Sequence, residues 1–293
     1  MESYTYLFLF VLQLVFTVVV LLALLHEKRL QKQLEKKNKQ LLTELLNLRG
    51  EIRAMRSTYL TFTGKIVRIS VSTTTASEEL KKLISVTEKL KKELERTEAM
   101  SVYEKEHSDC QYICGIDEVG RGPFAGPVVA GAVILPKDDP ILYLNDSKKL
   151  SEKKREALYD EIMERAVATG IGVVSPARID EINILQATYE AMRMAIGNLK
   201  VQPDLLLNDA VTIPEVEIPQ VPIIKGDAKS VSIAAASIIA KVTRDRLMVE
   251  YDKVLPGYDF ASNKGYGTKK HIEGLKELGP SPIHRRTFIK KYI

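Results

Sequence analysis

The spacing of apolar residues changes twice along this chain. Residues 6–25 form one apolar run without a charged side chain, which is long enough to cross a hydrocarbon core as an α-helix. Between residues 34 and 55, apolar positions recur at alternating steps of four and three, the a/d pattern of a coiled coil. From residue 111 onward, short runs rich in Val and Ile alternate with stretches of helical spacing, which predicts an α/β domain.

The apolar run predicts a membrane anchor. A cleaved signal peptide is the alternative, but no basic residue precedes the run, and the run is longer than an ordinary signal-peptide core. Lys28 and Arg29 follow the run, whereas only Glu2 precedes it. Because positive charge stays on the cytoplasmic side, we expect a single-pass protein whose remaining chain, including the α/β domain, is cytoplasmic.

The heptad segment predicts a helical stalk between the anchor and the α/β domain. Asn38 falls at an a position, where a buried Asn can fix the register of a parallel pair. We therefore expect a possible homodimer through the stalk, and a lone solvated helix is the alternative. The predicted domains are residues 1–26 for the anchor, 27–100 for the stalk and linker, and 101–293 for the α/β domain.

The pattern within the α/β domain predicts five strands and three long helices. The strands are expected at residues 112–117, 128–135, 170–175, 204–209 and 221–227, and the helices at residues 151–166, 179–199 and 232–254.

Composition and charge narrow the class of protein. At 293 residues with 45% hydrophobic content, the chain can bury a catalytic domain of ordinary size. Cys110 and Cys114 are too few and too close to indicate a disulfide framework. The net charge is +5, and basic residues are concentrated in the stalk and again after Lys264, where the chain could face a polyanion.

Four acidic residues follow apolar strands. Asp117 and Glu118 end the first predicted strand, Asp209 ends the fourth, and Asp227 ends the fifth. Polar residues at the ends of α/β strands gather at one edge of the sheet, and several carboxylates in one place suit Mg²⁺ or Mn²⁺. Taken alone, Asp209 and Asp227 are also ordinary turn residues or helix caps.

Four motifs resemble ribonuclease HII, in the family's order and over about residues 111–290. They are IDEVGRGPFAGPVVAGAVIL at 116–135, NDSKKLSEKKRE at 145–156, KGDAKSVSIAAASIIAKVTRDRLM at 225–248 and GYDFASNKGYGTKKHIEGLKELGPSPIHRRTF at 257–288. The resemblance implies a ribonuclease H-like mixed sheet flanked by helices, with a helical C-terminal region. It also implies hydrolysis of the RNA strand of RNA/DNA hybrids and incision 5′ of single ribonucleotides in duplex DNA, leaving 3′-hydroxyl and 5′-phosphate ends.

The resemblance also implies roles for particular residues. The family's four metal-binding catalytic acids fall on Asp117, Glu118, Asp209 and Asp227, where two divalent ions are expected. The family's ribose-reading motif falls on Gly120, Arg121 and Gly122, and its sugar-stacking tyrosine on Tyr266. Basic groups near the cleaved strand fall on Lys148, Lys149 and Lys225. Without the resemblance, these residues would be a tight turn, a packing tyrosine and solvated lysines.

Further charged residues have simpler expected roles. Arg285 and Arg286, with Lys269 and Lys270, are expected to bind backbone phosphates. His284 is expected to be a packing residue. Asp245 is expected to pair with an arginine beside it in the sequence.

The chain departs from the family's pattern at Ala210, where the family commonly has glycine after the third acid, and in its first 100 residues. A scaffold that binds hybrids without cutting them is the competing class, and the intact set of acids argues against it. In a third interpretation the enzyme is active and the stalk decides where it acts.

Overall fold

The computed structural model describes residues 85, 88–137 and 139–293. The chain divides into two compact units, residues 1–82 and 83–293, and only the second contains described residues. The predicted membrane span at 6–25 and the heptad segment of the stalk lie outside them. Across the described ranges, no helix combines the length and the apolar character that a membrane crossing requires.

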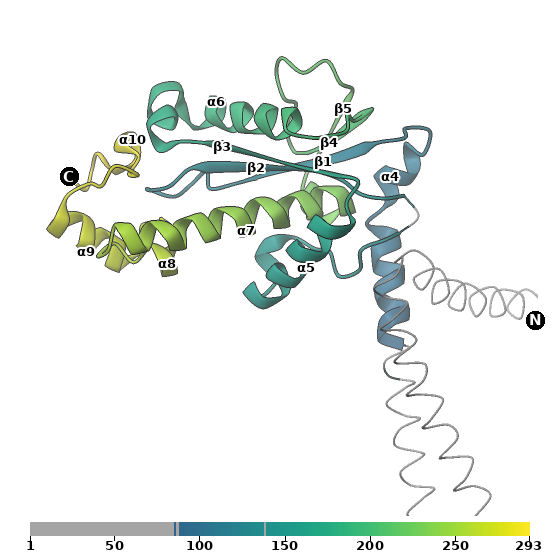
Figure 1. The fold of residues 1–293 in the computed structure, drawn as a ribbon, viewed down its shortest axis with the longest axis horizontal. Helices are drawn as coiled ribbons and strands as arrows, with labels where there is room; N and C mark the ends of the chain where they lie inside the picture. The colour runs from purple at the N-terminus through teal and green to yellow at the C-terminus, as the bar shows by residue number, and fades with distance from the viewer. Residues whose placement is uncertain (1–84, 86–87, 138) are drawn as a thin grey trace, which may run out of the picture. The chain divides into compact units, whose positions relative to one another are not determined.

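A five-stranded mixed sheet forms the centre of the second unit (Figure 1). Its strands are β1 (Ile113–Val119), β2 (Val128–Ile134), β3 (Ala168–Val174), β4 (Leu205–Asp209) and β5 (Gln220–Ile223), in the order β3-β2-β1-β4-β5. β2 pairs antiparallel with β1 and β3, whereas β4 pairs parallel with β1 and β5. The carboxyl ends of β1, β4 and β5 therefore lie at one edge of the sheet.

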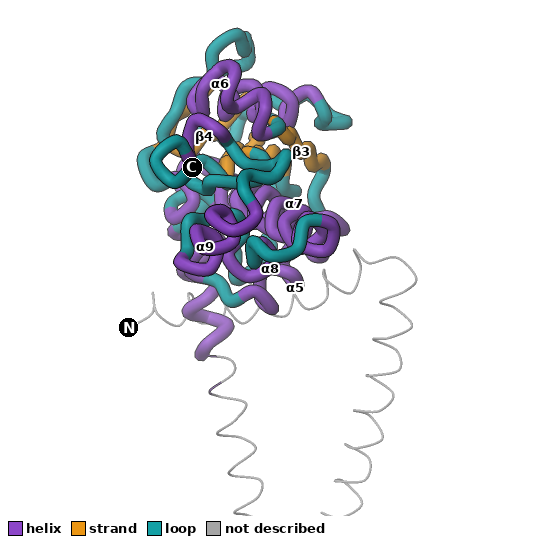
Figure 2. The backbone as a smooth tube through the Cα atoms, turned by 90° about the vertical axis from the view of Figure 1, so that its left-hand side faces the viewer, coloured by secondary structure: helices purple, strands orange, loops and turns teal. Residues whose placement is uncertain are grey.

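Helices cover both faces of the sheet. Helix α6 (Pro176–Gly197) packs on one face, and α7 (Val231–Val254) packs on the other with α5 (Glu152–Arg165) beyond it (Figures 1 and 2). Gly115 of β1 permits a close approach, because a Cβ atom there would collide with the backbone of Ser232 in α7. The first turn of α7 thus lies directly against β1.

The remaining elements are short. They are α4 (Val102–Glu106), the 3₁₀ turns η1 (Ser147–Lys149) and η2 (Gly226–Ala228), and the C-terminal helices α8 (Phe260–Asn263), α9 (Lys269–Leu278) and α10 (Arg286–Ile289).

The hydrophobic core has a layer on each side of the sheet. Ile116 and Ala132 face α6, where Ala191 and Met192 are fully buried, and Val133 faces α7. Helix α7 is buried around most of its circumference along its first half, because it lies between the sheet and α5. This explains why its sequence is almost continuously apolar instead of amphipathic.

Every predicted strand and long helix of the α/β domain is present, so the predicted fold class is confirmed for residues 101–293. The largest difference at an element boundary is in β5, which ends at Ile223 instead of residue 227, so the prediction that Asp227 ends this strand is wrong and Asp227 lies in η2. Helix α6 begins at Pro176 instead of residue 179. Ser175 caps this helix by accepting a hydrogen bond from the Arg178 backbone N–H at 3.2 Å. Asn183 interrupts the helix with a φ of 66°, which the apolar pattern does not reveal.

The segment before β1 packs against the α/β domain. Residues 88–99 are helical, and the Met100 side chain is buried in the layer between α7 and the sheet. Arg96 donates to the Leu144 carbonyl at 2.7 Å. Glu104 accepts hydrogen bonds from the Ser230 hydroxyl at 2.6 Å and the Ser232 backbone N–H at 3.1 Å. The packed unit therefore extends upstream of residue 101.

Candidate active site

Three of the four predicted acids reach one edge of the sheet from neighbouring parallel strands. Ile116 of β1 pairs with Asn208 of β4, so Asp117 and Asp209 are the next residues in register. Asp209 in turn pairs with Ile223 of β5, and Asp227 follows in η2. The sheet topology thus brings together residues more than one hundred positions apart.

The crowding of these carboxylates changes their ionisation. Burial raises the pKa of Asp117 well above its usual value, and the nearby Glu118 and Asp209 carboxylates raise it further. Burial also raises the pKa of Asp227, to which Asp146 and Asp209 contribute. Burial raises the pKa of Glu118, although Arg121 opposes the shift. Each group is harder to ionise than in water because desolvation and like charges both disfavour the anion.

Three of the four acids make a local contact that holds them in place. Asp117 accepts a hydrogen bond from the Glu118 backbone N–H at 2.8 Å, and Asp209 accepts one from Gly226 N–H at 2.7 Å. Glu118 lies 3.4 Å from a guanidinium nitrogen of Arg121. In this arrangement, no three His, Cys, Asp or Glu side chains of the described segments meet closely enough to hold a metal ion.

The chemistry of the donor set nevertheless fits a divalent cation. The acids supply hard oxygen ligands, which Mg²⁺ and Mn²⁺ prefer. Their raised pKa values arise from burial and from mutual repulsion, both of which a bound cation would offset. The chemistry of the residues present therefore fits such an ion.

Only one of the three predicted lysines is placed among the acids. Burial alone would lower the pKa of Lys148, but Asp117, Asp146, Asp227 and Asp209 together raise it. All three lysines are exposed, and neither Lys149 nor Lys225 forms an ion pair within the part of the chain that the structure describes. Their contact with substrate stays a prediction.

Asp146 is a site residue that the sequence reasoning missed. Its carboxylate accepts a hydrogen bond from the Lys148 backbone N–H at 2.9 Å and so caps η1. It also raises the pKa of Asp227. Asp146 is part of the DSKK motif, which could have indicated a role at the site, but only the two lysines of that motif were predicted to act there.

The glycine-arginine-glycine turn lies against the tyrosine predicted to work with it. Gly120 has a φ of 91°, and a Cβ atom there would collide with the Arg244 side chain. A Cβ atom at Gly122 would lie 3.7 Å from Cε1 of Tyr266, and Tyr266 is 47% exposed. These residues, far apart in sequence, therefore form one surface beside Glu118.

Arg285 does not face solvent, so the prediction that it binds phosphates is wrong. It is fully buried and donates hydrogen bonds to three backbone carbonyls, those of Gly120 at 2.5 Å, Arg121 at 2.9 Å and Gly126 at 2.8 Å. Burial, together with the nearby Arg244, lowers the pKa of Arg285 to about 9. Its function in the structure is to hold the turn at residues 120–126.

The second buried arginine, Arg244, completes this support. It donates to the carbonyls of Ala125, Pro127 and Lys264. Because C=O and N–H point in opposite directions across a trans peptide, carbonyls directed at Arg285 leave the N–H groups of Arg121 and Gly122 directed away from it. The turn thus presents backbone donors on its outer side.

Three further residues that were given roles from the sequence can be compared with the structure. Asp245 pairs with Lys241 at 2.7 Å, one helical turn earlier, and not with either neighbouring arginine. Lys269 lies 3.8 Å from Glu273. His284 is buried in the C-terminal region, as expected.

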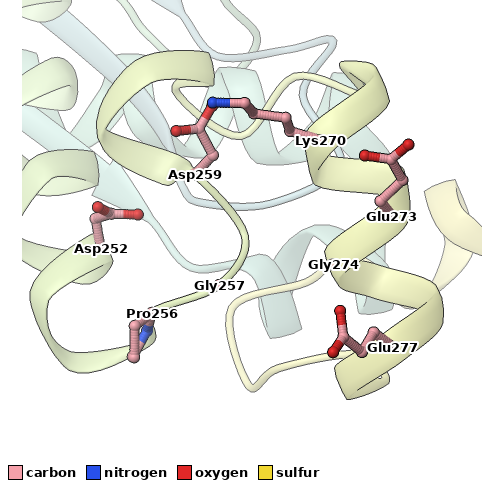
Figure 3. A pocket seen from close by; sticks show the side chains of 8 residues that line it. All are labelled: Asp252, Pro256, Gly257, Asp259, Lys270, Glu273, Gly274 and Glu277. Carbon is pink, nitrogen blue, oxygen red and sulfur yellow. The ribbon is translucent and has the colours of Figure 1, made fainter.

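A cavity of about 400 Å³ lies between the end of α7 and α9 (Figure 3). Its lining is acidic, with carboxylates from Asp252, Asp259, Glu273 and Glu277, and the Lys270 side chain points towards Asp259. Lys270, which was predicted to bind backbone phosphates, lines this cavity, but none of the residues predicted for catalysis, metal binding or ribose recognition does. Because an acidic lining repels phosphates, this cavity is unsuited to nucleic acid.

Comparisons with known proteins agree with the fold. The Ribonuclease HII family matches residues 114–291. The chain is 75% identical over 203 residues to the ribonuclease HII of Lachnoclostridium phytofermentans, covering 69% of this chain and 80% of that protein. It is 56% identical over 206 residues to that of Caldanaerobacter subterraneus, covering 70% and 86%.

Solved structures show the same architecture. The ribonuclease H2 of Pyrococcus horikoshii superposes with a TM-score of 0.52 at 28% identity, covering 62% of this chain and 97% of that one. Ribonuclease HII of Archaeoglobus fulgidus, solved with PCNA, superposes at 0.51 with 31% identity, covering 61% and 94%. With residues 114–291 matched by the family and 69% of its length matched by a 75% identical relative, the chain belongs to the ribonuclease HII family and is a ribonuclease H, an endonuclease acting on RNA/DNA hybrids.

Proposed function

We propose that this ribonuclease H also incises duplex DNA on the 5′ side of a single embedded ribonucleotide, leaving a 3′-hydroxyl and a 5′-phosphate. The observation that carries this proposal is the surface shared by the 120–122 turn and Tyr266 beside the carboxylates. A ribose placed there would meet backbone donors on one side and an aromatic ring on the other. The 2′-hydroxyl distinguishes RNA from DNA.

Asp117, Glu118, Asp209 and Asp227 would hold Mg²⁺ or Mn²⁺, and two ions are expected. When bound, such ions supply the positive charge that activates the attacking water and stabilises the leaving oxygen. The carboxylates fix where that charge sits. Asp117 and Asp227 are both almost fully buried, so both carboxylates are largely shielded from solvent.

The other residues orient the substrate. The N–H groups of Arg121 and Gly122 would donate to the ribose oxygen, and the Arg121 guanidinium would bind a phosphate. Tyr266 would stack on the next deoxyribose and select an RNA-to-DNA junction. Lys148 lies among the acids and would contact the scissile phosphate, whereas the exposed Lys149 and Lys225 would contact flanking phosphates.

Cleavage of a defined duplex tests this function. The full-length protein, purified with detergent, is mixed with duplex DNA containing one ribonucleotide, with Mg²⁺, with Mn²⁺ or with chelator. We expect metal-dependent incision 5′ of the ribonucleotide, no incision by Asp117→Asn, and normal incision by Asp252→Asn in the acidic cavity. Cutting of long hybrids without cutting of the single-ribonucleotide duplex would overturn the proposal.

We further propose that residues 6–25 anchor the protein in a membrane, with the catalytic domain in the cytoplasm and the 27–100 stalk pairing as a homodimer. The charge-free run and the basic residues behind it support the anchor and its orientation. Asn38 at an a position supports the pair.

Fractionation and cross-linking test these two claims separately. Deleting residues 1–26 should move the enzyme from the membrane fraction to the soluble fraction. Cross-linking of the full chain should give dimers that disappear when Leu41 and Leu45 are replaced by Asp. A full chain that stays soluble would refute the anchor, and one that yields only monomers would refute the pairing.

A further inference from the structure

Two buried histidines connect the C-terminal loop to the backbone of Tyr266. His271 is fully buried and His284 is 3% exposed. Their Nε2 atoms lie 2.9 Å apart. At one end, His284 Nδ1 lies 2.9 Å from the Ser281 backbone nitrogen, and at the other, His271 Nδ1 lies 2.8 Å from the Tyr266 carbonyl oxygen. The proposed hydrolysis uses neither imidazole.

The two ends of this chain of hydrogen bonds determine where the protons are. A backbone N–H can only donate, so Nδ1 of His284 is an acceptor and the ring of a neutral His284 carries its proton on Nε2. That proton is donated to Nε2 of His271, whose own proton must then be on Nδ1. A backbone carbonyl can only accept, and Nδ1–H of His271 donates to the carbonyl of Tyr266.

We propose that His284 and His271 are positioning residues, a neutral hydrogen-bonded relay that fixes the Tyr266 backbone beside the 120–122 turn and thereby supports substrate choice. This inference rests on the proposed role of Tyr266 in selecting the RNA-to-DNA junction. Protonation of either ring would break the relay, because an imidazolium cannot accept the hydrogen bond that each ring accepts here.

The surroundings keep both rings neutral. Aromatic rings of Phe124, Tyr258 and Phe260 surround the pair. Burial lowers the pKa of His271 and, aided by His271 and Arg286, lowers that of His284 to about 4. Arg286 of α10 and the Tyr258 hydroxyl, before α8, are the charged and titratable groups facing the pair. Among the described residues, no carboxylate hydrogen-bonds to either ring.

The first test reads the protons directly in the unaltered protein. Full-length protein labelled with ¹⁵N-histidine contains four imidazoles, which substitution by Gln assigns one at a time. At pH 7 we expect an Nε2–H tautomer for His284 and an Nδ1–H tautomer for His271. Any other tautomer at either ring, or an imidazolium at pH 7, would overturn the relay. Substitution of His26 and His107 alone identifies the remaining two signals as the buried pair, so the assignment does not require either buried-histidine variant to fold.

The second test separates positioning from general stability. The measured quantity is the ratio of kcat/KM for a single-ribonucleotide duplex to kcat/KM for a continuous RNA/DNA hybrid, because the folded fraction of a preparation cancels from this ratio. His271→Phe keeps an aromatic ring but removes the donor to Tyr266. We expect the ratio to fall by about fivefold, as for the net loss of one hydrogen bond. His107→Phe, in another part of the unit, is the matched control and should leave the ratio unchanged.

A double variant distinguishes failure of this inference from failure of the proposed function. Tyr266→Ala should lower the ratio, and adding His271→Phe to it should lower the ratio no further. If Tyr266→Ala leaves the ratio unchanged, the proposed role of Tyr266 is wrong. If Tyr266→Ala lowers it and His271→Phe does not, the role of Tyr266 stands and the relay is refuted.

Discussion

Arg285 and Arg286 are adjacent in the sequence and have opposite environments. Arg285 is fully buried against backbone carbonyls, whereas Arg286 is exposed on the first turn of α10. Nothing in the local pattern distinguishes them, because the residues that surround Arg285 come from a turn about 160 positions earlier. The candidate acids were easier to predict, since each lies at the end of an apolar run, or shortly after one, that the sequence shows directly.

Arg285→Lys should reduce both stability and cleavage. A lysine keeps the charge but cannot match the fork of donors that reaches three carbonyls, so buried carbonyls lose partners at about 1–3 kcal/mol each. We expect cleavage to fall at least about tenfold and the urea midpoint to fall with it. Arg286→Lys is the control for stability and should leave the midpoint unchanged. Equal midpoints for the two variants would contradict the supporting role of Arg285.

Ala210→Gly should stabilise the protein. Ala210 has a φ of 58°, a left-handed conformation that costs a residue with a Cβ atom about 1–2 kcal/mol. Glycine removes this strain but adds freedom to the unfolded chain, so we expect a net gain of about 0.5–1 kcal/mol in the free energy of unfolding. Urea denaturation measures this change. The φ value also explains why glycine suits the position after the third acid.

The stability contributed by His284 should disappear in mild acid. Its folded pKa, about 4, lies below the unfolded value of about 6.5, so the unfolded chain binds a proton first as the pH falls. The contribution is complete above pH 6.5 and is lost between about pH 6.5 and 4, by at most about 3 kcal/mol.

The acids whose pKa values are raised stabilise the folded protein more as the pH falls, which is opposite to the effect of His284. The contribution of His284 must therefore be measured as a difference between two proteins that share these acids. The free energy of unfolding of the wild type minus that of His284→Asn should shrink between pH 7 and pH 5. A difference that is independent of pH would show that His284 does not stay neutral in the folded protein.

The elements of the α/β domain were predictable because the spacing of apolar residues and the local composition change wherever a strand is followed by a helix or a helix by a strand. The order of the strands and the packing of the segment before β1 were not predictable in this way. That segment is polar and helical in pattern, like the stalk before it, and its docking depends on a few contacts to distant parts of the chain. Glu104 provides one of them by accepting two hydrogen bonds at the start of α7.

Glu104→Ala should destabilise the domain by about 1–2 kcal/mol, the usual effect of losing a helix-capping side chain. Glu98 is the matched control, because it lies in the same segment but pairs only with the exposed Lys105. Exposed ion pairs of this kind contribute little, so Glu98→Ala should be close to neutral. Thermal unfolding of the two variants checks the prediction, and equal melting temperatures would count against the docking.

The two compact units predict how the whole chain tolerates truncation. Deleting residues 1–82 follows the boundary between the units and should preserve cleavage of RNA/DNA hybrids in solution. Deleting residues 1–106 also removes Met100 and Glu104 and should lower the melting temperature and the activity. If both truncated proteins melt at the same temperature, the segment before β1 contributes nothing to the folded domain.

The dependence of the 120–126 turn on Arg285 has a consequence for biosynthesis. The turn leaves the ribosome early, but the guanidinium that organises it is translated some 160 residues later. A nascent chain therefore carries all four acids before it has an ordered surface for reading sugars. The enzyme should remain unable to choose a substrate until translation has passed residue 285, so a stalled or prematurely ended product should not distinguish a ribonucleotide from a deoxyribonucleotide.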